Sequence, residues 1–287
     1  MEEAIKKAEV LIEALPYIKE FHHKITVIKY GGSILGDKKI RQGVLEDIVF
    51  LSYMGLYPVL IHGGGPNISE RMKSEGKKTE FVEGMRVTDE ATLKIVEEEL
   101  NELNRLIVSE IKKLGGKAAG FTAREKSIIV AHKKRGKKDP GLVGEVESVD
   151  IETIRNELRA YTVCVICPMG KDREGVVYNI NADDVASDIA SRISAEKLVL
   201  LTNVKGVMRS PEDLNSFISS LSISQAKKLI KEGVVQEGMI PKVKSCISAL
   251  EGGVRKTHVI DARIPHALLL EVFTKQGIGT EISRDAS

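Results

Sequence analysis

The chain has 287 residues, with 43 basic and 41 acidic side chains and a formal net charge of +2. This near balance excludes a nucleic-acid binder that relies on bulk positive charge, and 4% aromatic residues without tryptophan exclude extensive base stacking. No apolar run reaches the roughly 18–20 residues that a membrane span needs, and the first segment is acidic and amphipathic, unlike a signal peptide, so we expect a cytoplasmic protein.

Apolar residues at spacings of three and four predict a helix over residues 1–21. Pro16 lies inside this segment. Because proline lacks an N–H and clashes with the preceding turn, it predicts a kink or a break near Leu15. The helix precedes the first core strand, so it either packs on its own domain or binds a partner subunit.

Residues 25–33 predict a buried strand that ends in a lysine and two glycines. Lys29 lies at the carboxyl end of this strand, where open α/β sheets bind their ligands, and Gly31 and Gly32 let the backbone approach a ligand closely. An anionic substrate suits this arrangement, and the alternative is a lysine that simply reaches water.

A second glycine-rich turn follows a strand predicted over residues 57–62. Gly63, Gly64 and Gly65 precede Pro66, which suits the first position of a helix. Free N–H groups and the helix dipole would make this junction an anion site. The alternative is a plain tight turn.

The remaining elements alternate between strands and helices. Arg86 precedes a helix predicted over residues 89–114, which Thr88 or Asp89 can cap, and its guanidinium could fork onto a carboxylate. Further strands are predicted over residues 117–121, 127–131, 143–149, 163–168, 198–202, 258–261 and, at the edge of the sheet, 279–282. Further helices are predicted over residues 42–53, 66–76, 151–158, 185–193, 222–232, 238–250 and 265–273, with a loop over residues 169–175. This alternation predicts an α/β fold, a three-layer αβα sandwich with a mainly parallel central sheet.

Cys164 and Cys167 form a C-x-x-C pattern, which is found in redox and zinc sites. They lie in a strand-like run, where positions three apart face opposite sides, and no second ligand pair accompanies them. We therefore expect buried, unpaired thiols and no metal held by protein ligands.

Neither G-x-x-x-x-G-K-[ST] nor G-x-G-x-x-G is present, which argues against a P-loop kinase and a dinucleotide-binding dehydrogenase. The chain has instead two glycine-rich anion sites together with Lys29, Lys242 and Asp183. Phosphoryl transfer needs positive charge around the moving group and little covalent help, which two lysines and backbone amides can supply. An aspartate between the lysines can hold both ammonium groups in place.

Six segments, in this order, resemble the amino acid kinase family, and the resemblance covers almost the whole chain. The segments are Val27-Ile28-Lys29-Tyr30-Gly31-Gly32, Ile61-His62-Gly63-Gly64-Gly65-Pro66-Asn67, Gly84-Met85-Arg86-Val87-Thr88-Asp89, Tyr178-Asn179-Ile180-Asn181-Ala182-Asp183, Gly238-Met239-Ile240-Pro241-Lys242 and Pro265-His266-Ala267-Leu268-Leu269-Leu270-Glu271.

The resemblance implies the amino acid kinase fold, with a kinked N-terminal helix over residues 1–22, an amino-acid-substrate lobe over 23–176 and a nucleotide-binding lobe over 177–287. Within the family, the chain resembles the members that use ATP to phosphorylate the side-chain carboxylate of N-acetyl-L-glutamate. Their product is an acyl phosphate in arginine biosynthesis. The expected partners are these two substrates, with Mg²⁺ carried by the nucleotide.

The resemblance also implies roles for single residues. Lys29 and Lys242 would stabilise the transferring phosphoryl group, and Asp183 would organise both lysines. The amino-acid substrate would be bound by Gly64, Gly65, Arg86 and Asn179. The phosphates and the nucleotide would be bound by Gly31, Gly32, Gly63, Thr202, Asn203, Gly206 and Met239. The nucleophile is already an anion, so no general base is needed and His62 is expected to be structural.

Three segments depart from the family pattern. Residues 121–126 replace a Ser-Gly-Lys-Asp-Gly-like segment. Asn203 replaces the aspartate of a Thr-Asp-Val-x-Gly segment, and Ala262 replaces the glycine of an Asp-Gly-Arg. The first two departures bear on nucleotide affinity and substrate choice.

In the amino acid kinases that this chain resembles, an N-terminal helix of this kind links dimers into a hexameric ring and accompanies feedback inhibition by L-arginine. We therefore expect a homo-oligomer, dimer or hexamer. The expected arginine site contains Tyr17, Lys197, Glu271, Gly277 and Gly279. Glu271 would bind the guanidinium, unless it is only a solvated helix residue. Two other functions stay open: a kinase for another acylated amino acid of the aminoadipate type, and a non-catalytic arginine-sensing subunit.

Overall fold

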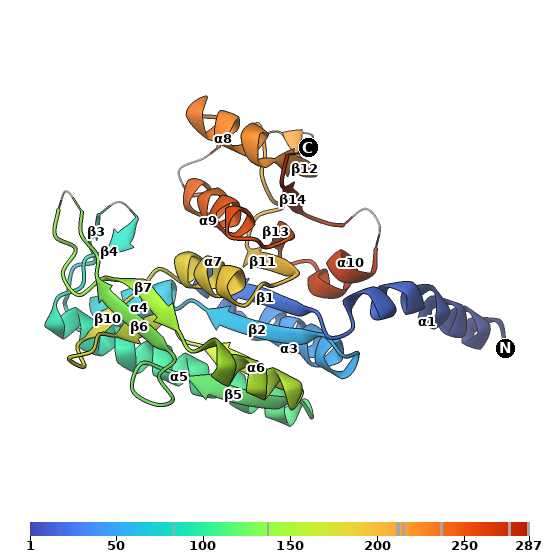
Figure 1. The fold of residues 1–287 in the computed structure, drawn as a ribbon, viewed down its shortest axis with the longest axis horizontal. Helices are drawn as coiled ribbons and strands as arrows, with labels where there is room; N and C mark the ends of the chain where they lie inside the picture. The colour runs from blue at the N-terminus through green and yellow to red at the C-terminus, as the bar shows by residue number, and fades with distance from the viewer. Residues whose placement is uncertain are drawn as a thin grey trace.

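An eight-stranded sheet lies at the centre of the computed structural model, which describes residues 1–82, 84–136, 138–210, 213, 216–235, 238–274 and 277–285, apart from the side chains of residues 3, 4 and 7 (Figure 1). In spatial order its strands are β12 (Ser220–Ser222), β14 (Thr280–Ser283), β13 (Lys256–Asp261), β11 (Lys197–Thr202), β1 (Ile25–Tyr30), β2 (Tyr57–His62), β8 (Thr162–Ile166) and β5 (Lys117–Phe121). Neighbouring strands are parallel, except that β14 is antiparallel to β13. The predicted mainly parallel sheet is confirmed.

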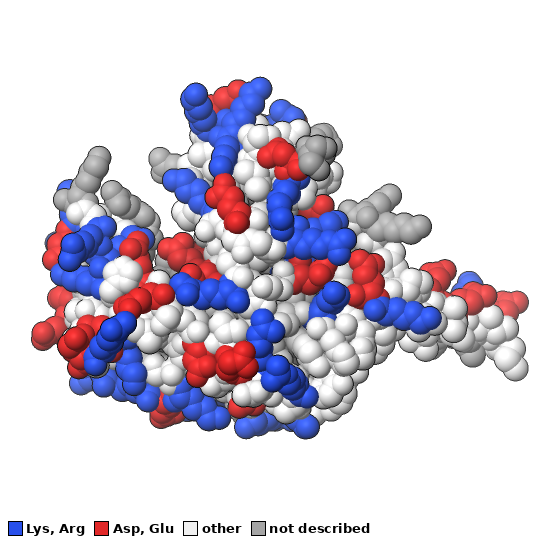
Figure 2. All heavy atoms as spheres, in the orientation of Figure 1, with Lys and Arg blue, Asp and Glu red and all other residues white. Residues whose placement is uncertain are grey.

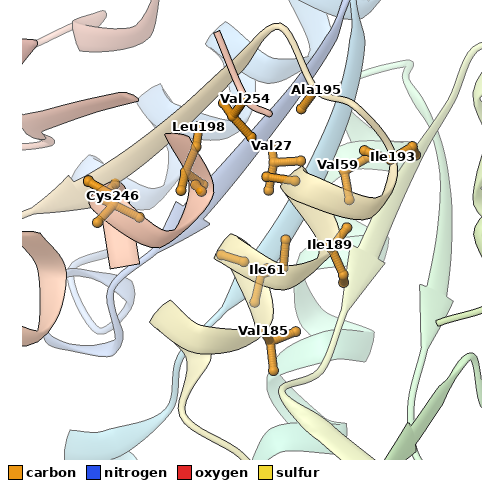
Figure 3. Close-up of a cluster of buried hydrophobic side chains, with 14 of the residues drawn as sticks. Val27, Val59, Ile61, Val185, Ile189, Ile193, Ala195, Leu198, Cys246 and Val254 are labelled. Atoms are coloured by element: carbon orange, nitrogen blue, oxygen red, sulfur yellow. The ribbon is translucent and has the colours of Figure 1, made fainter. Parts of the chain in front are cut away.

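Helices cover both faces of this sheet. One face packs against α3 (Lys38–Tyr53), α5 (Glu90–Lys113) and α10 (Ala267–Phe273). The other face packs against α6 (Ile151–Arg159), α7 (Ala182–Arg192), α8 (Ile223–Lys231) and α9 (Ile240–Glu251). Figure 3 shows this second layer, in which Val185 and Ile189 of α7 belong to the same buried cluster as Val27 of β1. The predicted three-layer αβα sandwich is therefore confirmed.

The side-chain alternation of β1 explains where Lys29 points. Successive side chains of a strand face opposite sides, so Val27 packs in the cluster beneath α7 and Ile28 in the cluster beneath α3. Lys29 shares the face of Val27, and its place near the end of β1 brings its side chain to the first turn of α7. A slip of the strand by one residue would move Lys29 to the opposite face, away from α7.

Two smaller sheets lie beside the main one. Over the described residues, the larger contains, in spatial order, β10 (Val177–Asn179), β9 (Met169–Lys171), β6 (Ile129–Lys133) and β7 (Gly144–Val149). The smaller pairs β3 (Phe81–Val82) with β4 (Met85–Arg86). The strand predicted over residues 127–131 is β6, which begins two residues later. The loop predicted over residues 169–175 begins with a short strand, β9, which pairs with β10.

Several predicted boundaries are wrong. Helix α3 begins at Lys38 rather than at residue 42, because the Asp37 carboxylate accepts hydrogen bonds from the N–H groups of Lys39 and Ile40, at 2.9 and 3.1 Å. The strand predicted at the sheet edge over residues 279–282 is also misplaced. It is β14, which lies between β12 and β13, and the short β12, which was not predicted, forms the edge.

Helix α1 (Glu2–Phe21) continues through Pro16, so of the two predicted alternatives, a kink or a break, the break is excluded. Near its end, the ring of Tyr17 meets the ring of Phe273 edge-on, with 6.3 Å between the centroids. The first turns project from the body of the molecule (Figures 1 and 2), and the side chains of Val10, Leu11 and Ile12 are exposed there. The apolar residues on the projecting part of α1 are therefore not buried on their own chain, whereas the end of the helix packs on the core through Tyr17 and Phe21.

Cys164 and Cys167 are unpaired and buried, as predicted. Cys164 packs in the cluster beneath α6, while Cys167 belongs to a third cluster that includes Ile95 and Leu100 of α5, so the two thiols lie on opposite sides of the sheet. Among the described helices, none combines the length and the apolar character that crossing a bilayer requires.

We predict that Asp37→Ala lowers the free energy of unfolding by about 0.5–2 kcal/mol, because two N–H groups in the first turn of α3 lose their acceptor. Asp37→Asn keeps an acceptor oxygen and should retain most of the stability. Urea denaturation followed by circular dichroism measures both changes, and equal stability of Asp37→Ala and the parent would contradict the capping role.

Candidate active site

A buried aspartate pairs with two lysines at the carboxyl ends of the central strands. Nζ of Lys29 lies 2.8 Å from Oδ1 of Asp183, and Nζ of Lys242 lies 3.7 Å from Oδ2. Lys29 comes from β1, Asp183 from the first turn of α7 and Lys242 from the first turn of α9. The structure thus brings together the three residues that the sequence predicted as one group.

The charge of Asp183 depends on the two lysines. Burial alone would raise the pKa of Asp183, but the ammonium groups of Lys29 and Lys242 outweigh it and hold this pKa below its ordinary value. Asp183 is only 6% exposed and Lys29 only 7%. Two ammonium groups and one carboxylate leave one positive charge in excess, which favours an anionic ligand.

Asn181, which was not among the predicted site residues, fixes the start of α7. Its side-chain oxygen accepts hydrogen bonds from the N–H groups of Asp183, at 2.8 Å, and Asp184, at 3.4 Å. This cap starts α7 at Ala182 rather than at the predicted residue 185 and sets the position of Asp183. An asparagine just before a turn with two acidic residues was the available signal.

The two glycine-rich turns approach each other too closely for a side chain to fit between them. A Cβ atom on Gly32 would lie 2.9 Å from the backbone nitrogen of Gly65 and 3.0 Å from that of Gly64. Gly64 and Gly65 begin α4 (Gly65–Ser74), and their N–H groups donate to no acceptor in the described part of the chain. Together they form a backbone donor site for an anion.

Two of the predicted phosphate donors are already engaged. The N–H of Gly31 donates to the carbonyl oxygen of Leu201 at 3.2 Å, and the N–H of Gly63 donates to that of Tyr30 at 2.9 Å. These two amides are occupied within the chain, and the binding of phosphate or nucleotide by Gly31 and Gly63 stays a prediction. The bonds instead tie the turns to the ends of β11 and β1.

A cleft of about 360 Å³ opens between the glycine turns and the lysines. Figure 2 shows the molecule hollowed between the α8–α9 region and the β3–β4 hairpin, on the side where this cleft lies. The predicted site residues that line it are Lys29, Gly31, Gly32, Gly63, Gly64, Gly65, Arg86, Asn179, Asp183, Thr202, Asn203 and Lys242.

A second cavity, of about 280 Å³, adjoins the cleft and shares Asn203 and Lys242 with it. The predicted nucleotide residues Gly206 and Met239 lie here, and most of the other lining side chains are apolar: Val204, Val207, Met208 and Val235. The hydroxyl of Thr202 is occupied, because its single proton lies between the carbonyl oxygens of Val204, at 2.8 Å, and Ile260, at 3.2 Å. An apolar cavity next to a cationic cleft can hold a planar group that is linked to an anion.

Arg86 is buried beside the cleft and makes no ion pair with a described residue. Its Nη1 lies 3.2 Å from Sδ of Met72 and 3.3 Å from Oγ1 of Thr79, while Nη2 donates to the carbonyl oxygen of Gly65 at 3.0 Å and to Oγ of Ser69 at 2.7 Å. Both Nη nitrogens are therefore occupied. The predicted forked pairing with a carboxylate would require a ligand to displace one of these acceptors.

Asn179 is connected to Arg86 through Thr88. The side-chain amide of Asn179 donates to Oγ1 of Thr88 at 3.3 Å, and Oγ1 of Thr88 donates to the carbonyl oxygen of Arg86 at 2.8 Å. These bonds join the end of β10 to the segment after β4, so the two predicted substrate-binding residues lie on one hydrogen-bonded unit.

His62 is buried directly before the second glycine turn. Burial lowers its pKa to about 4, so the ring is neutral at pH 7. Its Nε2 lies 3.3 Å from Nδ2 of Asn104 and 3.3 Å from Sγ of Cys167. His62 does not line the cleft, which agrees with the structural role expected of it.

The residues predicted to bind arginine lie outside the cleft, around the end of α1. Glu271 is only 6% exposed, so the alternative of a solvated residue is wrong. Its Oε1 lies 2.7 Å from Nδ1 of His258, and its carboxylate accepts the N–H of Ile278 at 3.1 Å. Burial opposes the charge of Glu271, but His258 and Ile278 hold its pKa below the ordinary value.

Other members of this predicted group surround Glu271. A Cβ atom on Gly277 would lie 3.0 Å from Oε2 of Glu271, so the loop runs against the carboxylate. Nζ of Lys197 lies 4.4 Å from the centre of the Phe21 ring, at the end of α1. Gly279 packs directly on β13, where a Cβ atom would clash with the carbonyl of Val259. His258 was not predicted, because nothing in the sequence pairs it with a residue 13 positions away.

The departures from the family pattern lie at different distances from the cleft. Residues 121–126 do not line it, and Thr122 and Glu125 close a local turn through two backbone N–H groups. Asn203, in contrast, lines both the cleft and the second cavity. Of the three departures, only the replacement of aspartate by Asn203 therefore lies in the candidate site.

The chain matches the model of the amino acid kinase family over residues 24–261. An acetylglutamate kinase of Syntrophomonas wolfei is 46% identical over 97% of this chain and 98% of that protein, and one of Aquifex aeolicus is 47% identical over 99% of each. A solved structure of N-acetylglutamate synthase from Neisseria gonorrhoeae, complexed with coenzyme A and N-acetyl-glutamate, has a TM-score of 0.88 at 25% identity. It covers 98% of this chain, which spans 64% of that synthase.

The family model spans most of the chain, and relatives close to half identical extend over nearly all of it. The strands of the main sheet other than β14, the two glycine turns and the Lys29–Asp183–Lys242 group all fall within the matched residues. The chain belongs to the amino acid kinase family.

Proposed function

We propose that this chain is an acetylglutamate kinase, which uses ATP to phosphorylate the side-chain carboxylate of N-acetyl-L-glutamate in arginine biosynthesis. The observation that carries the proposal is the Lys29–Asp183–Lys242 group, built on a buried aspartate, in a cleft with free backbone donors. Relatives at 46–48% identity bear the name acetylglutamate kinase. A kinase needs ATP, and we place the enzyme in the cytoplasm.

The chemistry follows from the charges in the cleft. An oxygen of the substrate carboxylate attacks the γ-phosphorus, the bond to the bridging oxygen of ADP breaks, and an acyl phosphate forms. The nucleophile is an anion already, so no residue needs to remove a proton. Lys29 and Lys242 neutralise charge on the moving phosphoryl group, Asp183 keeps both ammonium groups aligned, and Gly32, Gly64 and Gly65 contribute N–H donors.

The two substrates would occupy opposite sides of the cleft. We assign residues 23–176 to the amino-acid substrate, which Gly64, Gly65, Arg86 and Asn179 would bind. We assign residues 177–287 to ATP, with Asn203, Gly206 and Met239 at the second cavity. In the described part of the chain, no group of three or more His, Cys, Asp or Glu residues could hold a metal, so Mg²⁺ would arrive with the nucleotide.

Two alternatives are less well supported. A non-catalytic arginine-sensing subunit would not need two lysines held against a buried aspartate. A kinase for an aminoadipate-type substrate would use the same charges, and the names of the relatives favour N-acetyl-L-glutamate instead.

We also propose feedback inhibition by L-arginine at the Glu271 group. A carboxylate has about four lone-pair positions, so Glu271 keeps acceptor capacity for a guanidinium beside His258 and Ile278. Tyr17 and Lys197 connect this group to α1, and the loop through Gly277 and Gly279 would receive the carboxylate of arginine. Arginine would then lower substrate affinity, and substrate would reciprocally lower arginine affinity.

The proposed assembly is a homo-oligomer, dimer or hexamer, in which α1 contacts another subunit. Val10, Leu11 and Ile12 are 64–69% exposed in the single chain, and they follow one another on the part of α1 that projects from the body (Figure 1). A neighbouring copy that covers them would remove this apolar surface from water.

We predict that the parent phosphorylates N-acetyl-L-glutamate in a coupled ADP-release assay, faster than any other acyl amino acid in a panel that includes an aminoadipate derivative. Lys29→Ala and Lys242→Ala should each lower kcat about 10²–10³-fold with little change in KM, because both charges act mainly in the transition state. Lys244→Ala, an exposed lysine on the same helix as Lys242, is the control. Near-parental kcat in either variant would refute the role of that lysine.

We predict that millimolar L-arginine lowers the initial rate of the parent and that Glu271→Gln weakens this inhibition at least about 10-fold, because the neutral amide loses a charge-assisted bond to the guanidinium. Glu251→Gln, on the surface of α9, serves as the control. A parent whose rate does not respond to arginine would overturn the regulatory proposal and leave the kinase assignment intact.

We predict that deleting residues 1–14 lowers the number of subunits in the assembly, as measured by its mass in light scattering. Leu11→Asp should have the same effect, because it places a charge in an apolar contact. The deletion leaves Tyr17 and its contact with Phe273 in place. Lys19→Ala, also exposed on α1, is the control. If the mass stays unchanged in both variants, α1 does not link subunits.

A further inference from the structure

The guanidinium of Arg86 has almost no donor capacity left for a substrate. Arginine has five N–H groups, of which Nη1 and Nη2 carry four. Nη1 contacts Met72 and Thr79, Nη2 donates to Gly65 and Ser69, and only Nε makes no hydrogen bond to a described residue. As long as these contacts persist, Arg86 offers a carboxylate its charge and one N–H. A second donor must come from elsewhere.

Ser69 is placed to supply that donor. Its Oγ accepts the 2.7 Å hydrogen bond from Nη2 of Arg86, and Ser69 also lines the cleft. A hydroxyl that accepts a bond still has its own proton to donate, and this proton has no acceptor among the described residues. The cleft is the side on which a ligand could accept it.

The helix carries this hydroxyl towards the free amides of the glycine turn. Ser69 lies four residues after Gly65 on α4, and residues four apart share one face of a helix. The unpaired N–H groups of Gly64 and Gly65 therefore lie one turn from the Ser69 hydroxyl. Thr79, the other hydroxyl on Arg86, does not line the cleft.

We propose that Ser69 is a specificity-determining residue for the proposed kinase reaction, one that donates its hydroxyl proton to the substrate carboxylate facing Arg86. The inference rests on the proposed function and extends it to a residue outside the predicted set. Arg86 supplies the charge and polarises the Ser69 hydroxyl, which strengthens the bond that the hydroxyl donates. This arrangement selects an acceptor with a full negative charge over a neutral amide or ester.

The test compares Ser69→Ala, Thr79→Ala and Ser74→Ala by steady-state kinetics with N-acetyl-L-glutamate. Ser69→Ala should raise KM for this substrate about 10- to 100-fold, the loss expected for one hydrogen bond to a charged group, with kcat and KM for ATP unchanged. Thr79→Ala loosens Arg86 without touching the substrate and should raise KM several times less. Ser74, whose hydroxyl donates to the carbonyl oxygen of Arg71 on the same helix and to no other described residue, is the matched control.

Alanine is a better helix former than serine, so Ser69→Ala should fold. Ser69→Thr, which keeps the hydroxyl, should restore KM to within about threefold of the parent. Equal KM changes in Ser69→Ala and Thr79→Ala would mean that Ser69 only holds Arg86 in place, and an unchanged KM in Ser69→Ala would mean that it does neither. Both results overturn the inference while the kinase assignment stands, whereas a parent with no activity on acyl amino acids overturns both.

Discussion

Asp183 is a carboxylate kept charged at a depth where burial disfavours charge. Two ammonium groups compensate for its lost hydration, and they come from segments more than 200 residues apart in the chain. This ion pairing depends on apolar packing, which fixes the backbone positions of β1, α7 and α9. Val185 and Ile189 pack α7 against β1, Cys246 belongs to the same cluster and holds α9 on this face of the sheet, and Asn181 decides where α7 begins. The electrostatics of the cleft therefore depend on the register of a hydrophobic layer, and the register in turn decides which face Lys29 occupies.

The fold class, Lys29 and the two glycine turns could be predicted because their signals are local. Buried strands that run into glycine pairs or triplets, then into helices, identify the ligand-binding edge of a sheet without any knowledge of long-range contacts. Lys29 and the turn from Gly63 to Gly65 were found in this way. The engagement of the Gly31 and Gly63 amides could not be found, because it depends on the neighbouring strands β11 and β1. The donors that a turn offers to a ligand are those that the rest of the sheet leaves unused.

The difference between local sequence signals and long-range contacts also explains the other predictions that the structure corrects. A four-residue strand such as β14 carries no information about its neighbours, so its position inside the sheet was missed. The solvated position that the sequence left open for Glu271 was excluded only by the fold, because the burial of this residue comes from His258 on the adjacent strand and from the loop through Gly277. The Asp37 and Asn181 caps were within reach of sequence reasoning, because an Asp or Asn before a helical segment is a recognised start signal.

The interior position of β14 has a consequence for how the chain folds during its synthesis. β13 and β12 leave the ribosome before residues 280–283, but β12 pairs within the sheet only with β14, and β13 needs β14 to cover its outer edge. Until those four residues emerge, this end of the sheet is an unpaired strand edge, the kind of surface that recruits other chains. The half of the sheet from β1 to β5 has no such dependence, because its strands are all translated by residue 166. A nascent chain that stalls after β13 would therefore have paired strands from β1 to β5 and an unpaired strand edge at β13. This exposed edge is the surface to which a chaperone would bind.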